Sequence, residues 1–443
     1  MERTYIKDLK SSIGKEISIS GWVDVRRDQG KMIFFEFRDA SGKVQGVVLP
    51  NNKEALEICK EVRSEWVLNV TGIINKRPEK NIQKDRQNGD IEIEVKNVDI
   101  LARAKELPFE KDTEVNLDTY LDKLPFTLRT EKAKAVFKVQ ETAIQAFRDA
   151  VKNEGFTEFQ SPVLVGGDAE GGAAAFKVDY YYDQTAFLAT SPQLYKQIMV
   201  GIYERAFTTT KVFRGEKHAT TRHLSEIVQM DFEMGFIKDH TDVMTVLERV
   251  IKRMVSSVVE KNPEAFELLK VEKPIIPAKF PILKLREAQE ILEKEYDIKC
   301  IGELDLEPEH ERQICEWAKK NHGSDFIFIT HFPTKKRAFY TYADPKDPET
   351  SLSFDLLFRG LEINSGSQRI HDYDMLVEKL KSRKLDPEKF SFYLQAFKYG
   401  MPPHGGCSTG LERFTARMLN LDNVKEATLF PRDMNRIDTL LSK

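Results

Sequence analysis

A dense group of charged residues stands between two apolar segments, in the stretch FRGEKHATTRHLSE at residues 213–226. The flanking segments TKVF and IVQMDFEMGF read as the strands of a hairpin, which would bring Arg214 and Arg222 to one end of a sheet. Guanidinium groups bind phosphate oxygens in pairs and stay charged when buried. Arg214 could therefore stabilise charge that develops on an α-phosphate, and Glu216 could accept from an adenine amino group. A solvated charged hairpin is the alternative.

Carboxylates follow in the strand-like segment SFDLLFRGLEINSGSQRI, which contains Asp355, Glu362, Ser365 and Arg369. A carboxylate that shares a cleft with phosphate-binding arginines needs a cation to bridge it to ATP. Magnesium does this through one or two carboxylates together with phosphate oxygens. The segment therefore suggests a magnesium site, while a strand-edge carboxylate satisfied by backbone donors is the alternative for Asp355.

Three further segments carry isolated charges in unusual settings. GCSTGLERF reads as a small-residue turn that enters a helix, where Arg413 would lie near the positive end of the helix dipole and could hold a γ-phosphate. SPQLYKQ places Lys196 on an otherwise apolar helix, and AEGG places Glu170 in a glycine loop suited to close over an amino group. A capped surface helix and a flexible connection are the plain alternatives.

The absence of other motifs narrows the chemistry. The chain has no G-x-x-x-x-G-K-[ST], no G-x-G-x-x-G that opens a helix after a strand, and no G-x-S-x-G. Any nucleotide would therefore be held by arginine side chains and a metal. Three arginines, two carboxylates and a glycine lid together indicate an ATP-dependent ligase.

Elements that could position these residues fall into two groups. Residues 16–102 read as five short strands with one helix, NKEALEICKEV, between the third and the fourth, which is the pattern of an OB-fold barrel. Later, strand follows strand more often than strand follows helix, which favours an antiparallel sheet in an α+β arrangement. We expect an OB-fold domain at 1–104, a hinge at 105–130 and a catalytic domain at 131–443 with an insertion at about 240–330.

Bulk properties agree with an ordinary globular protein. The 443 residues are 41% hydrophobic and 31% charged, with a formal net charge of −3, so whole-molecule charge gives no sign of nucleic-acid binding. The four cysteines form no C-x-x-C pair, which fits a reducing cytoplasmic setting. No secretion signal and no apolar run of roughly 20 residues is present, so we expect no membrane partner.

With these motifs in view, the sequence resembles the class II aminoacyl-tRNA synthetases. FRGEKHATTRHLSE resembles their motif 2, GLERF their motif 3, and GFTEFQSPVL their motif 1, with Pro162 at the interface of a homodimer. The order of the motifs agrees, and the resemblance covers essentially the whole chain. Within the class, SPQLYKQ, AEGG, SFDLLFRGLEINSGSQRIHDYD and LFPRD are most similar to aspartyl-tRNA synthetases of the archaeal and eukaryal type.

The resemblance implies roles for individual residues, with catalysis assigned to Arg214 and Arg413. It implies that aspartate contacts Glu170, Gln193, Lys196, Arg214, Asp231, Asp355, Ser365 and Arg369. It implies that ATP contacts Arg214, Glu216, Arg222, His223, Leu224, Glu362, Gly410, Leu411, Glu412 and Arg413. Magnesium would be carried by Glu362 and Ser365.

In the OB-fold, Arg27, Phe34, Gln45 and Glu92 match the family's contacts to the tRNA anticodon. The resemblance implies that Phe34 stacks on an unstacked base while Gln45 and Glu92 read base edges. A place in the barrel core is the alternative for Phe34.

Two positions depart from the family's pattern, and the choice of an aspartate enzyme has competitors. Asp24 stands where relatives carry a bulky or imidazole side chain, and Gly215 replaces a more common alanine. A buried aspartate side chain needs cationic partners, which Lys196 and Arg369 can supply, and this argues against an asparaginyl enzyme. An ammonia-using asparagine synthetase and a silent tRNA-binding paralogue also compete with this reading. Either the aspartate tRNA alone or also the asparagine tRNA would be charged, and Asp24 and the 76–90 loop bear on this choice.

Overall fold

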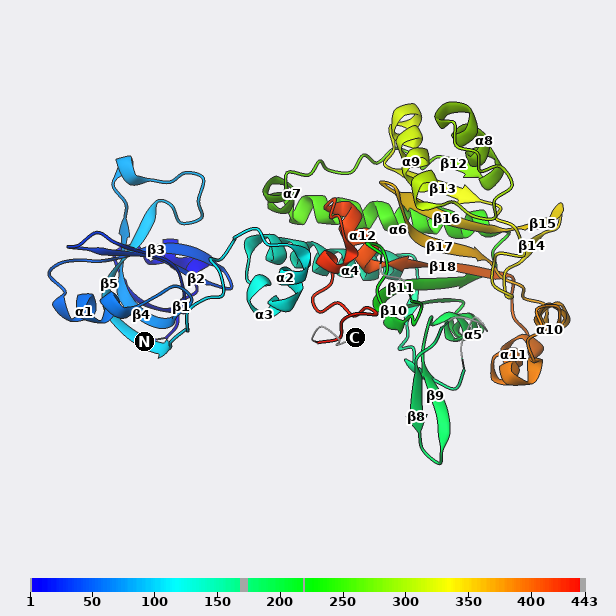
Figure 1. Ribbon diagram of the computed structural model, residues 1–443, viewed down its shortest axis with the longest axis horizontal. Coiled ribbons are helices and arrows are strands. Elements are labelled where there is room, and N and C mark those ends of the chain that lie inside the picture. The colour runs from blue at the N-terminus through cyan, green and yellow to red at the C-terminus, as the bar shows by residue number, and fades with distance from the viewer. Residues whose placement is uncertain (1, 168–173, 218–219, 439–443) are drawn as a thin grey trace. The chain divides into compact units, whose positions relative to one another are not determined.

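The chain divides into two compact units, Met1–Thr113 and Glu114–Lys443. The computed structural model describes residues 2–167, 174–217 and 220–438 (Figure 1). Glu170, which was predicted to contact aspartate, lies outside the described residues.

The first unit is a closed five-stranded barrel in the order β1-β2-β3-β5-β4, with one helix between the third and fourth strands. Its elements are β1 (Glu16–Asp28), β2 (Ile33–Asp39), β3 (Gly42–Val48), α1 (Lys53–Glu61), β4 (Val67–Lys76) and β5 (Ile91–Ala102). Alternation along β2 sends Phe35 and Phe37 into the core, where their rings stack with centroids 5.2 Å apart. The predicted OB-fold is confirmed.

The second unit is built on an eight-stranded sheet in the order β12-β13-β16-β17-β18-β11-β10-β6. Neighbouring strands run antiparallel except in the outermost pairs β12–β13 and β10–β6, which are parallel. The strands are β6 (Thr157–Glu158), β10 (Arg205–Phe213), β11 (Glu226–Gly235), β12 (Ile282–Lys284), β13 (Phe326–Thr330), β16 (Ser353–Phe358), β17 (Leu361–Gln368) and β18 (His404–Gly410). This sheet confirms the expected α+β arrangement.

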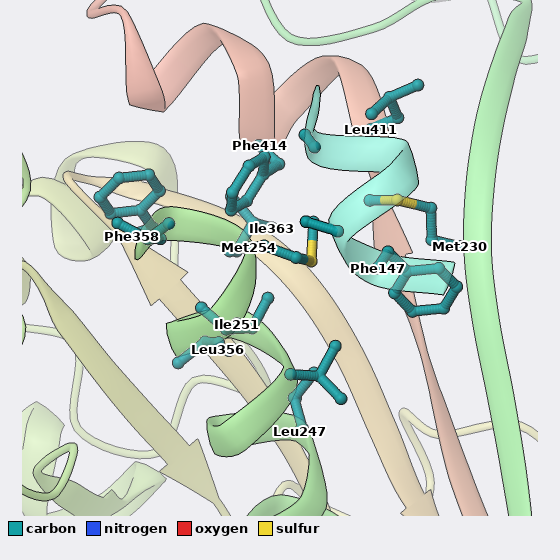
Figure 2. Close-up of a cluster of buried hydrophobic side chains, with 14 of the residues drawn as sticks. Phe147, Met230, Leu247, Ile251, Met254, Leu356, Phe358, Ile363, Leu411 and Phe414 are labelled. Atoms are coloured by element: carbon teal, nitrogen blue, oxygen red, sulfur yellow. The ribbon is translucent and has the colours of Figure 1, made fainter. Parts of the chain in front are cut away.

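The main core of this unit joins the helices α4 (Glu131–Asn153), α6 (His240–Lys261) and α12 (Leu411–Met418) to the sheet. Thr130 caps α4 by accepting a hydrogen bond from the Ala133 backbone, and Gly155, with φ of +83°, follows its end. Figure 2 shows Phe147 of α4, Met254 of α6 and Phe414 of α12 packed within one apolar cluster. This shared core holds the three helices against the sheet.

Residues 240–330 contribute to this same architecture. They supply α6, α7 (Pro263–Leu269), α8 (Leu285–Tyr296) and α9 (Pro308–His322), and the two strands β12 and β13 extend the main sheet. Helices α8 and α9 pack beside β13 (Figure 1), and their apolar faces form a separate cluster that includes Leu285, Ile314 and Ala318.

The second unit contains further α-helices and short strands. They are α2 (Leu117–Asp122), α3 (Leu124–Thr127), β7 (Leu164–Val165), β8 (Lys177–Tyr180), β9 (Gln184–Leu188), α5 (Gln193–Tyr203), β14 (Ala343–Asp344), β15 (Asp347–Ser351), α10 (Tyr373–Ser382) and α11 (Ser391–Lys398). Among the described residues, no helix has the length and apolar character needed to cross a membrane.

Candidate active site

A cavity of about 160 Å³ opens beside strands β11, β17 and β18 of the second unit. Strand β10 ends at Phe213 and β11 begins at Glu226, so Arg222 lies in the connecting loop and not on a strand of the predicted hairpin. The loop nevertheless brings both motif arginines to one cavity. The predicted ATP and metal residues that line it are Arg214, Arg222, His223, Leu224, Glu362, Ser365, Gly410, Glu412 and Arg413.

Arg413 and Glu362 meet at this cavity from different elements. Arg413 lies in the first turn of α12, as the sequence indicated, and its Nη1 donates to the Glu362 carbonyl at 3.0 Å and to Oε2 at 3.3 Å. A cation and a carboxylate therefore stand side by side, as a nucleotide and a bridging cation would require.

Two of the predicted ATP residues have structural partners of their own. Leu411 packs its side chain in the main core, so only its backbone can reach a ligand. Both carboxylate oxygens of Glu412 accept from the Val228 backbone at 3.0 and 3.2 Å, which ties α12 to β11. Burial raises the pKa of Glu412 to about 7.

One predicted ATP residue does not line the cavity, and one residue that was not predicted does. Glu216 is half-buried in the loop between β10 and β11 but is not part of the cavity lining. Gln229, which was not predicted, lines the cavity.

Asp355 pairs with an arginine that the sequence did not single out. Arg337 donates from Nη2 to Asp355 Oδ2 at 2.7 Å and from Nη1 to Ser365 Oγ at 3.2 Å, and its guanidinium lies 3.9 Å from the Phe332 ring centroid. Asp355 and Ser365 are direct cross-strand partners on β16 and β17. Because Arg337 lies in the irregular segment before β14, no periodic pattern indicated it.

The oxygen atoms around Asp355 suit magnesium. Asp355 Oδ1 is buried and has no hydrogen-bond partner among the described residues. Burial and the nearby Glu362 carboxylate raise the pKa of Asp355 to about 6, although Arg337 acts in the opposite direction. A divalent cation relieves such a concentration of negative charge. No group of three or more His, Cys, Asp or Glu side chains suited to a metal occurs in the described part of the chain. The remaining ligands would be hydroxyl, water and phosphate oxygens.

A cluster of four buried charges lies on β11 and its neighbours. Lys196 of α5 places Nζ 2.8 Å from Asp231 Oδ2 and 3.5 Å from Glu233 Oε2. Arg369 donates to Glu233 from Nε at 2.8 Å and from Nη2 at 3.1 Å. Burial alone would raise the pKa of Glu233, but Arg369 and Lys196 lower it, so the carboxylate stays charged. The structure thus brings together Lys196, Asp231 and Arg369, which were predicted.

Glu233 was missed, although one signal pointed to it. Side chains two positions apart on a strand lie on the same face. Glu233 lies two positions after Asp231 on β11 and therefore faces the same cations. The cluster retains hydrogen-bonding capacity for a ligand. Asp231 Oδ1 has no hydrogen-bond partner among the described residues. Within the same described residues, Arg369 donates four hydrogen bonds, and its guanidinium group has five N–H donors.

Gln193 belongs to a hydrogen-bonded chain behind this cluster. Its Nε2 donates to Gln197 Oε1 at 2.9 Å, the Tyr393 hydroxyl donates to the same oxygen at 3.1 Å, and Gln197 Nε2 lies 2.8 Å from His404 Nε2. The Pro402 carbonyl, 2.9 Å from His404 Nδ1, can only accept, so Nδ1 carries the proton and Nε2 accepts from Gln197. Burial lowers the pKa of His404 to about 4, which keeps it neutral.

In the barrel, the four predicted anticodon residues lie on adjoining strands. Arg27 and Phe34 are cross-strand partners on β1 and β2, and Gln45 Nε2 donates to Glu92 Oε2 at 2.8 Å. Arg27, Phe34 and Gln45 line one cavity together with Arg77. Phe34 is half-buried on the outer face of the barrel and does not belong to its core cluster.

Asp24 forms ion pairs with three cationic side chains of the protein, one of which, Lys43, lines the same cavity. Its carboxylate contacts Arg38 Nε at 3.2 Å, Lys43 Nζ at 2.7 Å and the Lys111 ammonium. Burial would raise the pKa of Asp24, but Lys111 and Lys43 lower it to about 2.

These two units match two family models. Residues 116–434 match the class II tRNA synthetases (D, K and N), and residues 17–101 match the OB-fold nucleic acid binding domain. The chain belongs to the class II tRNA synthetases of this group.

Similar proteins include both aspartate and asparagine enzymes. The aspartate–tRNA(Asp/Asn) ligase of Thermus thermophilus is 42% identical over 98% of this chain and 99% of its own, and the aspartate–tRNA(Asp) ligase of Pyrococcus furiosus is 38% identical over 96% of each. Among solved structures, asparaginyl-tRNA synthetase from Pyrococcus horikoshii in complex with asparaginyl-adenylate has a TM-score of 0.91 at 32% identity and covers 99% of both chains. Aspartyl tRNA synthetase from Entamoeba histolytica has a TM-score of 0.87 at 28% identity and covers 99% of this chain and 93% of its own. The fold is therefore shared by enzymes for both amino acids.

Proposed function

We propose that this chain is an aspartate–tRNA ligase, which activates L-aspartate with ATP and transfers it to tRNA. The observation that carries the choice of amino acid is the buried pair of cations, Lys196 and Arg369, which meet at Glu233. A substrate carboxylate placed there accepts hydrogen bonds from both cations through its two oxygens, whereas an amide offers one acceptor oxygen and turns its N–H donors toward cations.

The chemistry that we propose needs no covalent bond to the protein. The α-carboxylate of aspartate attacks the α-phosphorus of ATP, and pyrophosphate leaves. The aspartyl group then passes from the adenylate to the terminal adenosine of tRNA, and AMP leaves. Asp231 Oδ1 accepts from the substrate ammonium, while Lys196 and Arg369 bind the side-chain carboxylate. Rate enhancement arises from positioning and from charge stabilisation.

The cavity residues divide the work on the phosphates. Arg214, which is exposed at the end of β10, stabilises charge on the α-phosphate, and Arg413 with Arg222 holds the outer phosphates. Glu362 and Ser365, with Asp355 beside them, would hold magnesium, which supplies positive charge next to the phosphates when it is bound.

Assembly, setting and anticodon contacts complete the proposal. We propose a homodimer that joins through motif 1, where Val163 and Leu164, next to Pro162, are 38% and 43% exposed. The four cysteines are free and buried, which suits the reducing cytoplasm. Arg27, Phe34, Gln45 and Glu92 would contact the anticodon.

The test is aspartylation of purified tRNA(Asp) and purified tRNA(Asn) in separate reactions. We expect aspartate to be attached to both, because the Thermus thermophilus relative carries both tRNAs in its name. Charging of tRNA(Asp) alone would narrow the proposed range to one tRNA. Charging of tRNA with asparagine in place of aspartate would overturn the proposal.

A further inference from the structure

Glu311 is a buried carboxylate that accepts hydrogen bonds from Arg222 and Glu362, two residues of the cavity proposed to bind ATP. Glu311 itself does not line this cavity. It lies in the first turn of α9, in the segment that was expected to be an insertion, and its side chain is 7% exposed. Arg222 Nη2 donates to its Oε1 at 2.8 Å and to its Oε2 at 2.6 Å. The backbone N–H of Glu362 donates to Oε2 at 3.0 Å.

The helix explains why Glu311 faces inward. Ile314, Cys315 and Ala318 lie three, four and seven positions further along α9, which places them on the same face, and all three are buried in the cluster against β13 and β16. An acidic side chain on such an apolar face is costly unless it is hydrogen-bonded. Glu311 accepts hydrogen bonds from Arg222 and from the Glu362 backbone, so its position follows from specific partners.

A bulge in β17 supplies one of these donors. Leu356 pairs with Asn364 and Leu357 pairs with Glu362, so Ile363 is the extra residue on β17. Bulges redirect side chains and leave ladder groups unpaired. Glu311 accepts the N–H of Glu362 at this point and thereby fixes the strand segment that carries the predicted magnesium carboxylate.

The bond to Arg222 leaves that residue able to bind a ligand. Within the described residues, both side-chain hydrogen bonds of Arg222 use Nη2, so Nη1 and Nε stay available, and Arg222 lines the cavity. One carboxylate therefore orients the cation from the motif 2 loop and the backbone of β17 at the same time.

We propose that Glu311 is a positioning residue for ATP, and that the segment carrying α9 is thus a functional part of the nucleotide site. This inference rests on the proposed function. It predicts that loss of the Glu311 charge weakens ATP binding and leaves aspartate binding nearly unchanged, because Lys196 and Arg369 form their hydrogen bonds with strands β11, β17 and β18.

The test is tRNA-independent pyrophosphate exchange by the full-length protein, with KM measured separately for ATP and for aspartate. Glu311→Gln keeps the shape and removes the charge, Glu311→Asp keeps the charge, and Glu316→Gln on the exposed side of α9 is the matched control. Melting curves establish that each variant folds. We expect Glu311→Gln to raise the KM for ATP at least tenfold with less than a twofold change for aspartate, Glu311→Asp to recover part of the loss, and Glu316→Gln to match the wild type.

A double variant tests the route of the effect. If Glu311 acts through Arg222, then Glu311→Gln adds little to the KM of an Arg222→Gln protein. An unchanged or lowered KM for ATP in Glu311→Gln, or an equal rise for both substrates, would overturn the inference. Absence of exchange in the wild type would instead contradict the proposed function, so the two failures are distinguishable.

Discussion

At the scale of single residues, the proposed aspartate site depends on a cluster of buried charged side chains. Lys196, Asp231, Glu233 and Arg369 form a neutral set of two cations and two carboxylates, each at most 4% exposed. Removal of one member leaves a buried charge without its partner, which costs more than the pair contributes. His404 behind them completes the set as a neutral acceptor.

His404 gives the site a pH dependence. Its pKa is about 4 when folded and 6.5 by reference, so between these values the unfolded chain binds a proton that the folded protein does not. Stability is therefore fully present above pH 6.5 and falls as the pH drops toward 4. We expect His404 by itself to account for a loss of roughly 2 kcal/mol in the free energy of unfolding between pH 7 and pH 5. The pKa of His240 is also lowered to about 4 by burial, so His240 adds to the total.

Urea unfolding at both pH values checks this, with His404→Gln and the exposed His322→Gln as a matched pair. The loss should shrink in His404→Gln and persist in His322→Gln. An equal loss in all three proteins would show that His404 does not carry the effect.

At the scale of elements, close strand packing on β18 shapes the same cluster. A Cβ added at Gly406 would lie 2.1 Å from Glu233 Oε2 and 2.2 Å from the Phe232 carbonyl, so β11 and β18 would have to separate. We expect Gly406→Ala to cost about 3 kcal/mol or more and to raise the KM for aspartate.

Thermal melting and aspartate-dependent exchange measure these two effects. In Gly201→Ala of α5, the new Cβ would meet only Met401 Cε at 3.8 Å, so this variant should keep its stability. Equal melting temperatures for Gly406→Ala and the wild type would contradict the packing argument.

The elements themselves were largely predictable because their signals are local. Alternation and turn residues indicated the five barrel strands, and the helix in NKEALEICKEV was expected between the third and the fourth strand. Contacts between residues distant in sequence were not predictable. Glu311 and Arg222 are 89 positions apart, and Arg337 lies outside any periodic segment. Charged residues whose role depends on tertiary contacts give no such local pattern.

At the scale of the whole molecule, the two units should divide tRNA recognition from activation. Base stacking on an aromatic side chain contributes about 1–3 kcal/mol, so Phe34→Ala should raise the KM for tRNA roughly tenfold. Pyrophosphate exchange without tRNA should not change, because Phe34 belongs to the barrel.

The check is to measure tRNA aspartylation and tRNA-independent pyrophosphate exchange for the same variant. Phe392→Ala, which removes an exposed phenylalanine of the second unit, is the control. A fall in exchange for Phe34→Ala, or an unaltered KM for tRNA, would count against an anticodon role for this side chain.

The proposed function requires that the buried cluster around Lys196 and Arg369 selects aspartate over asparagine. Pyrophosphate exchange into ATP, measured without tRNA and with aspartate and asparagine in separate reactions, tests it most directly. We expect exchange with aspartate and none above background with asparagine. Exchange driven by asparagine, or by neither amino acid, would contradict it.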